Sequence, residues 1–248
     1  MTSKFTYLVC CYFGPRSNVK YNSILQENKF FFAEKHLEFL KSYKNNDIEK
    51  IIFVVNKTAN DDVDEITSYF SEKTKEISDD IEFVLLFRDN RYFSYGAWND
   101  AIVEDLQSEN DESSYYFCLE EDYIPSSSDF LSPFIDRCNE QTPYVCCRAI
   151  TNHSDYMDHP SMSVGLHLKS VCKNVYDKNK FVFLVDGDNS YQNAWRIQQT
   201  FYKPFLDMGY GITDILDSYS SPFLCSTTNE VKMFGNENSK VLIEPIVP

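Results

Sequence analysis

Positive charge is scarce in this sequence. It carries 23 lysine and arginine residues against 38 aspartate and glutamate residues, a formal net charge of −15 at pH 7. Nucleic-acid binding needs a basic surface that neutralises phosphates, so this balance argues against nucleic acid as a partner. It also argues against an anionic membrane surface. A phosphorylated small ligand remains compatible with the acidic balance, because a bound divalent cation can invert the local field.

Long hydrophobic runs are also lacking. The longest apolar stretches are far shorter than the ~20 residues that a transmembrane helix needs. The opening residues Met1–Lys4 do not begin a signal peptide. We therefore expect no membrane span and a cytoplasmic location.

The eight cysteines include no CxxC pair. Most of them lie in apolar, strand-like runs, where neighbours such as Cys10 and Cys11 would face opposite sides of a strand. This placement favours reduced core residues over a disulfide framework or a zinc site, and it indicates a reducing compartment. His153, His159 and His167 match no zinc spacing either. We therefore expect no histidine metal site.

The first half of the chain alternates between strand and helix patterns. Continuous apolar runs predict buried strands, and helical spacing or acidic helix starts predict helices between them. The expected strands are residues 5–13, 48–55, 81–87 and 116–119, and the expected helices are residues 30–43, 61–77 and 95–106. Such alternation predicts a Rossmann-like α/β fold with a central, mostly parallel sheet flanked by helices.

The second half is less regular. Pro204 should interrupt a long helix that starts near Ser190 and runs towards Met208. No repeat or linker is visible, so we expect a single domain over residues 1–248, with halves 1–125 and 126–248. The other expected elements are a helix at 130–138, a strand at 144–150, a polar loop at 151–163, a short strand and helix within 164–175, and an edge element at 241–246.

Polar residues gather where the expected strands end. Because the carboxyl ends of parallel strands meet at one edge of a sheet, these residues should line one crevice, where α/β proteins bind ligands. The clusters are Tyr12-Phe13-Gly14, Asn56, Arg88-Asp89-Asn90 and Glu120-Glu121-Asp122.

The three acids after the fourth strand indicate a cation site. Residues two apart on an extended segment share a face, so Glu120 and Asp122 can address one ligand while Glu121 points elsewhere. Neighbouring carboxylates repel one another unless solvent or a cation relieves them. Mg²⁺ and Mn²⁺ prefer such oxygen ligands, often one or two carboxylates together with substrate phosphates. An ordinary charged turn is the alternative.

The run Phe117-Cys-Leu-Glu-Glu-Asp-Tyr-Ile-Pro125 resembles the DXD region of GT-A-fold glycosyltransferases, which use nucleotide-diphosphate sugars. In that class an acid-x-acid motif at a strand end binds a divalent metal, the ribose and the sugar diphosphate. Here the motif has Glu120 in place of the first aspartate. The upstream stretches Asp89–Arg91 and Ser94–Asn99 resemble the loop and helix start that precede this motif in family-2-like members. The resemblance covers residues 5–125, and proteins of this type also occur in large algal viruses.

The resemblance implies a GT-A fold, Mn²⁺ or Mg²⁺ as cofactor, a nucleotide-diphosphate sugar as donor and a glycan or glycoprotein as acceptor. It assigns the metal to Asp122 and Glu120. The residues that it implies for donor binding are Tyr12, Phe13, Gly14, Asn56, Arg88, Asn90, Arg91, Gly96, Asn99, Glu120 and Glu121. A solvated loop is the alternative for the two arginines.

Besides Glu120, this sequence departs from the family pattern in two places. The second strand ends in Asn56 where the family usually has an aspartate. The position expected for the catalytic Glu-Asp pair falls near Gln198-Gln199, which cannot act as bases. A base must then come from elsewhere, and the candidates are Asp188, Asp214 and Asp186. Asp188 has the alternative of capping the helix that follows it.

The resulting expectation is a metal-dependent glycosyltransferase that inverts the anomeric carbon by single displacement. Trp195 and its aromatic neighbours are either an acceptor platform or a core stripe. The missing Glu-Asp pair leaves open a non-catalytic nucleotide-sugar or glycan-binding domain. A nucleotidyltransferase is a further alternative, although Gly14-Pro15-Arg16 is a poor version of the glycine-rich phosphate loop of that class.

Overall fold

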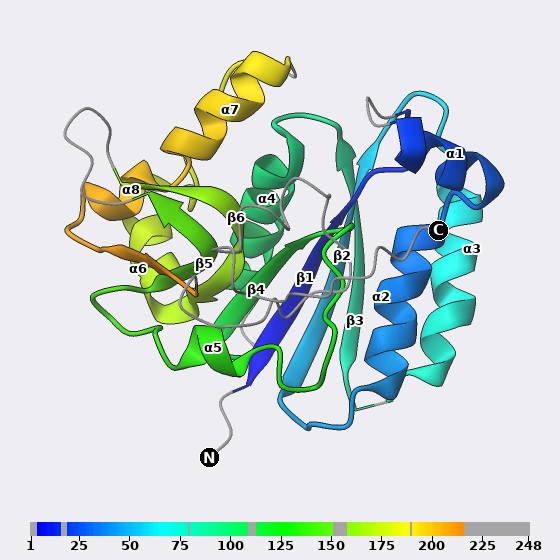
Figure 1. The fold of residues 1–248 in the computed structure, drawn as a ribbon, viewed down its shortest axis with the longest axis horizontal. Coiled ribbons are helices and arrows are strands. Elements are labelled where there is room, and N and C mark those ends of the chain that lie inside the picture. Colours follow the sequence, from blue (N-terminus) through cyan, green and yellow to red (C-terminus); the bar gives the residue numbers. More distant parts are fainter. Residues whose placement is uncertain are drawn as a thin grey trace, which may run out of the picture.

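The computed structural model describes residues 4–15, 19–78, 80–108, 113–150, 158–188 and 190–215. These residues form a seven-stranded sheet with the strand order β3-β2-β1-β4-β6-β5-β7 (Figure 1). The strands are β1 Phe5–Cys11, β2 Ile48–Lys57, β3 Glu82–Asp89, β4 Tyr115–Glu120, β5 Tyr144–Ile150, β6 His159–Leu168 and β7 Ile212–Asp214. The helices are α1 Val19–Glu27, α2 Phe31–Ser42, α3 Val63–Lys73, α4 Phe93–Gln107, α5 Ser132–Ile135, α6 Lys169–Asn179, α7 Tyr191–Thr200 and α8 Lys203–Leu206.

The sheet is mixed and mostly parallel. Strands β3, β2, β1 and β4 run parallel to their neighbours, β6 is antiparallel to both β4 and β5, and β7 is parallel to β5. The α/β class and the mostly parallel sheet flanked by helices, which the sequence predicts, are therefore confirmed. The carboxyl ends of β1, β2, β4, β5 and β7 all lie at one edge of the sheet.

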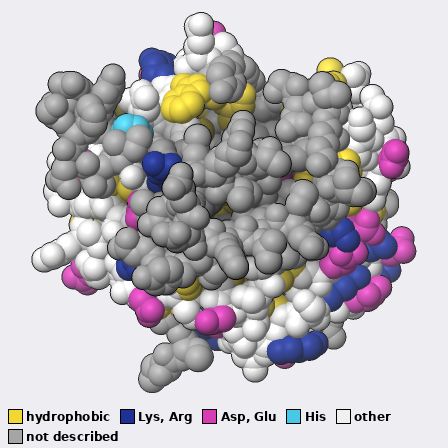
Figure 2. Space-filling view, viewed as in Figure 1, with side chains coloured by type: hydrophobic (Ala, Val, Ile, Leu, Met, Phe, Trp, Pro, Cys, Tyr) yellow, Lys and Arg dark blue, Asp and Glu magenta, His cyan; other side chains and the backbone are white. Residues whose placement is uncertain are grey.

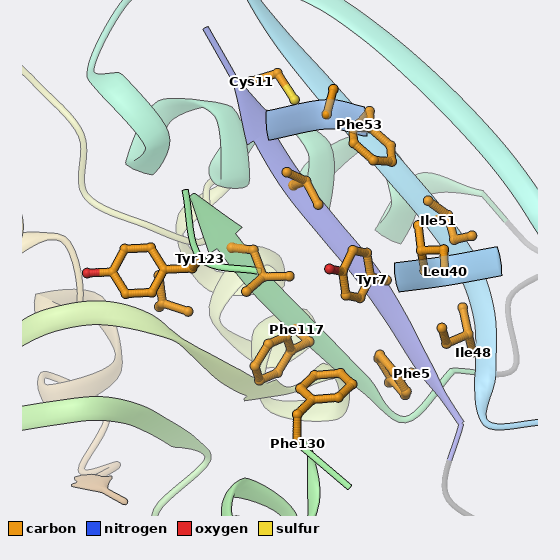
Figure 3. Packing of buried hydrophobic residues seen from close by; sticks show 14 of the residues in the cluster. Phe5, Tyr7, Cys11, Leu40, Ile48, Ile51, Phe53, Phe117, Tyr123 and Phe130 are labelled. Atoms are coloured by element: carbon orange, nitrogen blue, oxygen red, sulfur yellow. The ribbon is translucent and has the colours of Figure 1, made fainter. Parts of the chain in front are cut away.

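The apolar run of β1 is continuous because helices cover both faces of the sheet. Phe5, Tyr7 and Val9 pack on the side of α2 and α3, whereas Leu8 and Cys10 pack on the side of α4. Figure 3 shows the first of these layers, in which Phe130 lies between the rings of Phe5 from β1 and Phe117 from β4. The sheet is thereby fixed on both sides and holds its strand ends in place.

Helices α2 and α3 cover the same face of the sheet, and salt bridges link them. Lys29, just before α2, pairs with Glu65 on α3, and Lys41 pairs with Glu76 at 2.9 Å. Figure 2 shows acidic and basic side chains side by side over this part of the surface. Helix α3 begins as expected, because the side chain of Asp62 accepts the backbone N–H groups of Asp64 and Glu65.

Several expected elements differ in extent. Helix α5 has four residues instead of the nine expected at 130–138. The expected loop at 151–163 is wrong from His159 onwards, because β6 starts there and pairs with the end of β5. The long helix breaks at Phe201-Tyr202, and Pro204 lies in the first turn of α8, where its missing N–H costs nothing. Helix α1 and strand β7 were not expected, and residues 151–157 and 241–246 lie outside the described residues.

No cysteine in the described part of the chain forms a disulfide, and most are buried. Burial raises the pKa of the Cys118 and Cys146 thiols well above the usual value. The expected core position is confirmed for these two residues. None of the helices in the described ranges is both long enough and apolar enough to cross a membrane.

Two fully buried histidines remain neutral in the fold. The Nε2 atom of His36 lies 3.0 Å from the carbonyl oxygen of Glu121, and its Nδ1 lies 2.6 Å from the hydroxyl of Tyr7. A carbonyl only accepts, so Nε2 carries the proton and Nδ1 accepts from Tyr7. His167 stacks on Tyr144, with ring centroids 4.1 Å apart. Burial lowers the pKa of each histidine from 6.5 to about 3.

We expect these histidines to make the fold sensitive to mild acid. Their folded-state pKa lies below the unfolded one, so their stabilisation is complete above about pH 6.5 and is lost as the pH falls towards 3. Between about pH 7.5 and about pH 5.5 each should remove on the order of 1 kcal/mol from the free energy of unfolding. Urea unfolding at both pH values measures the sum. His36→Gln should remove about half of this loss, and an unchanged loss in that variant would contradict the assignment.

Candidate functional site

A pocket of about 500 Å³ opens at the carboxyl edge of the sheet. It lies where β1, β2 and β4 end and where α4 begins. Its lining residues are Cys10, Tyr12, Pro15, Asn56, Asn90, Phe93, Ser94, Glu120, Glu121 and Asp122. Six residues that the sequence singled out for one crevice are thus brought together, from four separate parts of the chain.

The acids of this pocket are held in different ways. Ser94 donates from its hydroxyl to Glu120 Oε1 at 2.7 Å, which links the end of β4 to the first turn of α4. Glu121 is 4 % exposed, and its two carboxylate oxygens accept the backbone N–H of Tyr12 at 3.0 and 3.1 Å. Glu121 therefore fastens the end of β4 to the end of β1. Glu120 and Glu121 are thus held by different elements, α4 and β1, while both line the pocket.

The N-terminus of α4 brings partial positive charge to the pocket, opposite in sign to the carboxylates. The helix begins at Phe93 on the wall of the pocket, and no side chain caps its first turn. The first N–H groups and the macrodipole make this end of a helix partly positive, which favours a bound phosphate. The pocket thus combines carboxylates, which favour a cation, with a helix end, which favours an anion.

The backbone that leads into α4 is strained. Tyr92 and Phe93 both adopt left-handed conformations, with φ of 60° and 55°. Such conformations are uncommon for bulky residues and cost of order 1–3 kcal/mol each. Asn56 holds this turn by donating from Nδ2 to the carbonyl of Phe93 at 3.1 Å. Strain of this kind, held by a buried side chain at a pocket wall, is typical of binding sites.

Asn56 and Arg88 form one connected polar wall. Arg88 donates from Nη1 to Asn56 Oδ1 at 2.6 Å and from Nε to Asp100 at 2.7 Å. It also donates to the carbonyl of Arg91 at 2.8 Å. Asn56 lines the pocket. Arg88 lies outside the lining, holds Asn56 by this hydrogen bond and places a positive charge next to the pocket.

The other residues implied for donor binding lie outside the pocket lining. Phe13 packs edge-on against Phe30, with ring centroids 5.2 Å apart. Arg91 is exposed beside Asp89. Asn99 is buried, and its Oδ1 accepts the N–H groups of Val182 and Phe183 at 3.0 Å each, so it ties a distant segment to α4.

One of the glycines implied for donor binding is needed for close packing. A Cβ on Gly96 would lie 2.5 Å from the carbonyl oxygen of Arg91, which is backbone and cannot move aside. Gly96 therefore permits the Arg91 loop to lie against α4. A Cβ on Gly14 would meet the Tyr12 hydroxyl at 2.5 Å, and that side chain can turn away.

The three candidate bases have different partners. Asp186 pairs with Arg196 at 2.7 Å. Asp188 accepts the Ser190 N–H at 3.0 Å, and hydrogen bonds from Ser190 hold the pKa of Asp188 below its usual value, which weakens it as a base. The cap of α7 is Ser190, whose hydroxyl accepts the N–H of Asn193, so Asp188 holds the turn before the helix and does not cap it. The catalytic role of each remains a prediction.

The position of the third candidate base, Asp214, follows from the pairing of the strands. It lies in β7, level with Cys118 of β4 through the paired residues of β6 and β5. Three strand spacings, about 14 Å, separate it from β4. Its Oδ2 accepts the Ala149 N–H at 2.7 Å. Asp214 thus stands at the end of β7 that lies at the same edge of the sheet as the pocket.

Trp195 is not part of a core stripe. It is 50 % exposed on α7, so the core alternative is wrong for this residue. Helix α7 lies close to the first residues of β6, where Gln198 Nε2 donates to the carbonyl of Pro160 at 3.4 Å. That end of β6 belongs to the pocket edge of the sheet, which leaves the acceptor-platform alternative open.

Within the described ranges, no group of three or more histidine, cysteine, aspartate or glutamate residues is arranged to hold a metal ion. Glu120 and Asp122 are a pair of carboxylates in one pocket. A pair is the usual protein contribution to a Mg²⁺ site that substrate phosphates and water complete. The metal assignment therefore remains a prediction that depends on a phosphorylated ligand.

No protein-family model matches this chain, and no curated protein is significantly similar to it in sequence. Solved structures resemble it more distantly. The Aq1419 protein of Aquifex aeolicus VF5 has a TM-score of 0.45 at 13 % identity, covering 86 % of both chains. Residues 1–349 of S. aureus TarS have a TM-score of 0.43 at 13 % identity, covering 80 % of this chain and 55 % of that one. A 4-diphosphocytidyl-2C-methyl-D-erythritol synthase has a TM-score of 0.49 at 10 % identity, covering 94 % and 97 %. Likenesses this distant carry no inference about function.

Proposed function

We propose that this protein is a metal-dependent glycosyltransferase that uses a nucleotide-diphosphate sugar as donor. One observation supports this most: Glu120, Asp122 and the N-terminus of α4 line the same pocket. A helix end attracts a diphosphate, whereas three nearby carboxylates repel it. A divalent cation between the acids and the diphosphate satisfies both.

Each side chain then has a defined task. Asp122 and Glu120 would hold the cation, and Ser94 keeps Glu120 oriented through its 2.7 Å hydrogen bond. The cation would stabilise the charge that develops on the leaving diphosphate. Asn56 and Arg88 form the wall beside the α4 turn. The first N–H groups of α4 are placed to donate to phosphate oxygens.

The acceptor is proposed to bind on the other side of β4. Asp214 is the preferred general base, because it stands at the pocket edge of the sheet about three strand spacings from β4. General-base catalysis of this kind contributes about 10²–10⁴-fold. The exposed ring of Trp195 on α7 would provide an apolar face for an acceptor sugar. Single displacement with one base inverts the anomeric carbon.

A thermal-shift screen tests the proposal. Nucleotide-diphosphate sugars are added to the full chain with and without Mn²⁺. We expect the matching donor and Mn²⁺ together to raise the melting temperature by more than the sum of their separate effects, because each completes the other's site.

Product analysis separates the alternatives. Release of a nucleoside diphosphate, slowly to water or faster to an acceptor, supports the glycosyltransferase. Release of pyrophosphate would identify a nucleotidyltransferase instead. Stabilisation without turnover with any acceptor would identify a binding domain, and no stabilisation by any donor would contradict nucleotide-sugar binding.

A further inference from the structure

Strand β3 forms one edge of the sheet and carries none of the features that usually protect an edge. Among the described residues it pairs only with β2, and it does so over its full length without a bulge. Its sequence, EFVLLFRD, contains no proline and no lysine, and its six central residues are partly buried. An eight-residue edge strand with an apolar centre is a template for pairing with another chain.

The sequence of β3 is complementary to itself when read antiparallel. If two copies of β3 pair about a twofold axis through Leu85, each residue from Glu82 to Arg88 meets a matching one, and Asp89 lies beyond this stretch. The opposed pairs are Glu82 with Arg88, Phe83 with Phe87, Val84 with Leu86, and Leu85 with Leu85. Aromatic, aliphatic and opposite-charge pairs across strands are the ones that stabilise a sheet.

On both faces of the paired strands, the apolar layer of one copy would join the same layer of the other copy. Phe83, Leu85 and Phe87 pack on the side of α2 and α3. Val84 and Leu86 pack on the side of α4, beside a groove of about 170 Å³. In the proposed register each apolar side chain meets an apolar side chain from the same face of the second copy, so both layers extend across the axis.

Charge selects this register over its neighbours. Glu82 and Arg88 lie at opposite ends of the same face of β3, because even-numbered residues share a face. Within its own copy Glu82 pairs with Lys50 at 3.1 Å and Arg88 with Asp100 and Asn56, so the opposition across the axis adds to these contacts. A slip by one residue would oppose Glu82 with Asp89, and a slip the other way would oppose it with Phe87. The first costs like-charge repulsion, and the second places a carboxylate opposite an aromatic ring.

We propose that β3 is a homodimer interface, in which a second copy of this chain pairs antiparallel about Leu85 and joins the two sheets into one. The contact is isologous, so it closes after two copies and removes the exposed edge. Apart from Arg88, which also supports the pocket wall, the interface shares no described residue with the pocket.

Sedimentation equilibrium of the full chain over a wide concentration range gives the first test. We expect a concentration-dependent mass that approaches twice the chain mass of 29.0 kDa. A chain that stays monomeric at every concentration would overturn the proposal, including the case in which another segment of the same chain covers β3.

Cysteine cross-linking gives the register. Opposed residues lie about 5 Å apart, so Leu85→Cys should be joined to its own copy by a short bismaleimide. Glu82→Cys is the matched control, because its two copies would lie about 20 Å apart. Dimers cross-linked at position 85 and not at position 82 are the expected result. A dimer that cross-links equally at both positions, or at neither, uses another surface and overturns the proposal. The wild-type chain reports the background from its own cysteines, and its mass decides the question if Leu85→Cys does not fold.

Discussion

Replacing Asp122 with asparagine is expected to lower metal-dependent turnover of the donor by about 10²–10³-fold. Asparagine keeps the size of the side chain and one acceptor oxygen but removes the charge that would hold the cation. A bound cation supplies several kcal/mol of transition-state stabilisation. A loss of about 3–4 kcal/mol corresponds to the expected decrease in rate. The rate of nucleoside diphosphate release, measured against Mn²⁺ concentration, reports the effect.

A charge-matched variant separates this effect from a general change in charge. Asp80 is exposed at the opposite end of the sheet, just before β3, and Asp80→Asn should turn over like the wild type. Asp122→Asn should need more Mn²⁺ for half-maximal rate, because the remaining ligands bind it less tightly. An Asp122→Asn enzyme with wild-type rate and wild-type Mn²⁺ dependence would place the cation elsewhere.

Replacing Asp105 with alanine is expected to lower the free energy of unfolding by about 3 kcal/mol. Asp105, on α4, accepts from Lys50 at 2.7 Å, from Lys169 at 2.9 Å and from the Tyr116 hydroxyl at 2.6 Å. The Asp105 side chain is 2 % exposed and that of Lys50 is 5 % exposed. Removing one partner of a buried pair leaves an uncompensated charge, which typically costs about 3–5 kcal/mol. We expect the lower end of this range, because Lys50 would still be paired with Glu82 at 3.1 Å after Asp105 is removed.

Urea unfolding of Asp105→Ala measures this loss, and an exposed ion pair provides the control. Asp177 pairs with Lys173 at 3.2 Å on α6, where both side chains are more than half exposed. Asp177→Ala should change the free energy of unfolding by less than about 0.5 kcal/mol. Equal losses in the two variants would show that burial of the Asp105 network contributes nothing.

The convergence of the polar clusters could be predicted from the sequence, because it depends only on strand direction. Runs such as residues 5–13 and 48–55 are apolar throughout, which indicates buried parallel strands. Their carboxyl ends must then meet at one edge, and Tyr12, Asn56 and Glu120 do line one pocket there.

The walls of the pocket could not be predicted, because long-range contacts decide them. Asn99 was expected to bind the donor, but it accepts two N–H groups from a segment more than 80 residues away. The left-handed Tyr92 and Phe93 have no local signal, since aromatic residues rarely adopt this conformation. Ser94 was inside the helix-start motif, but its partner Glu120 becomes visible only when α4 and β4 are packed together.

The contact between Glu120, Asp122 and a cation can be observed directly. A crystal of the full chain is grown with Mn²⁺ and the donor that gives the largest thermal shift, and the anomalous signal of manganese is mapped. We expect one peak at bonding distance, about 2.0–2.2 Å, from the Asp122 carboxylate and from a diphosphate oxygen of the donor, with Glu120 beside it. A donor bound in the crystal with its diphosphate away from these acids, and no manganese at either carboxylate, would contradict the proposed chemistry.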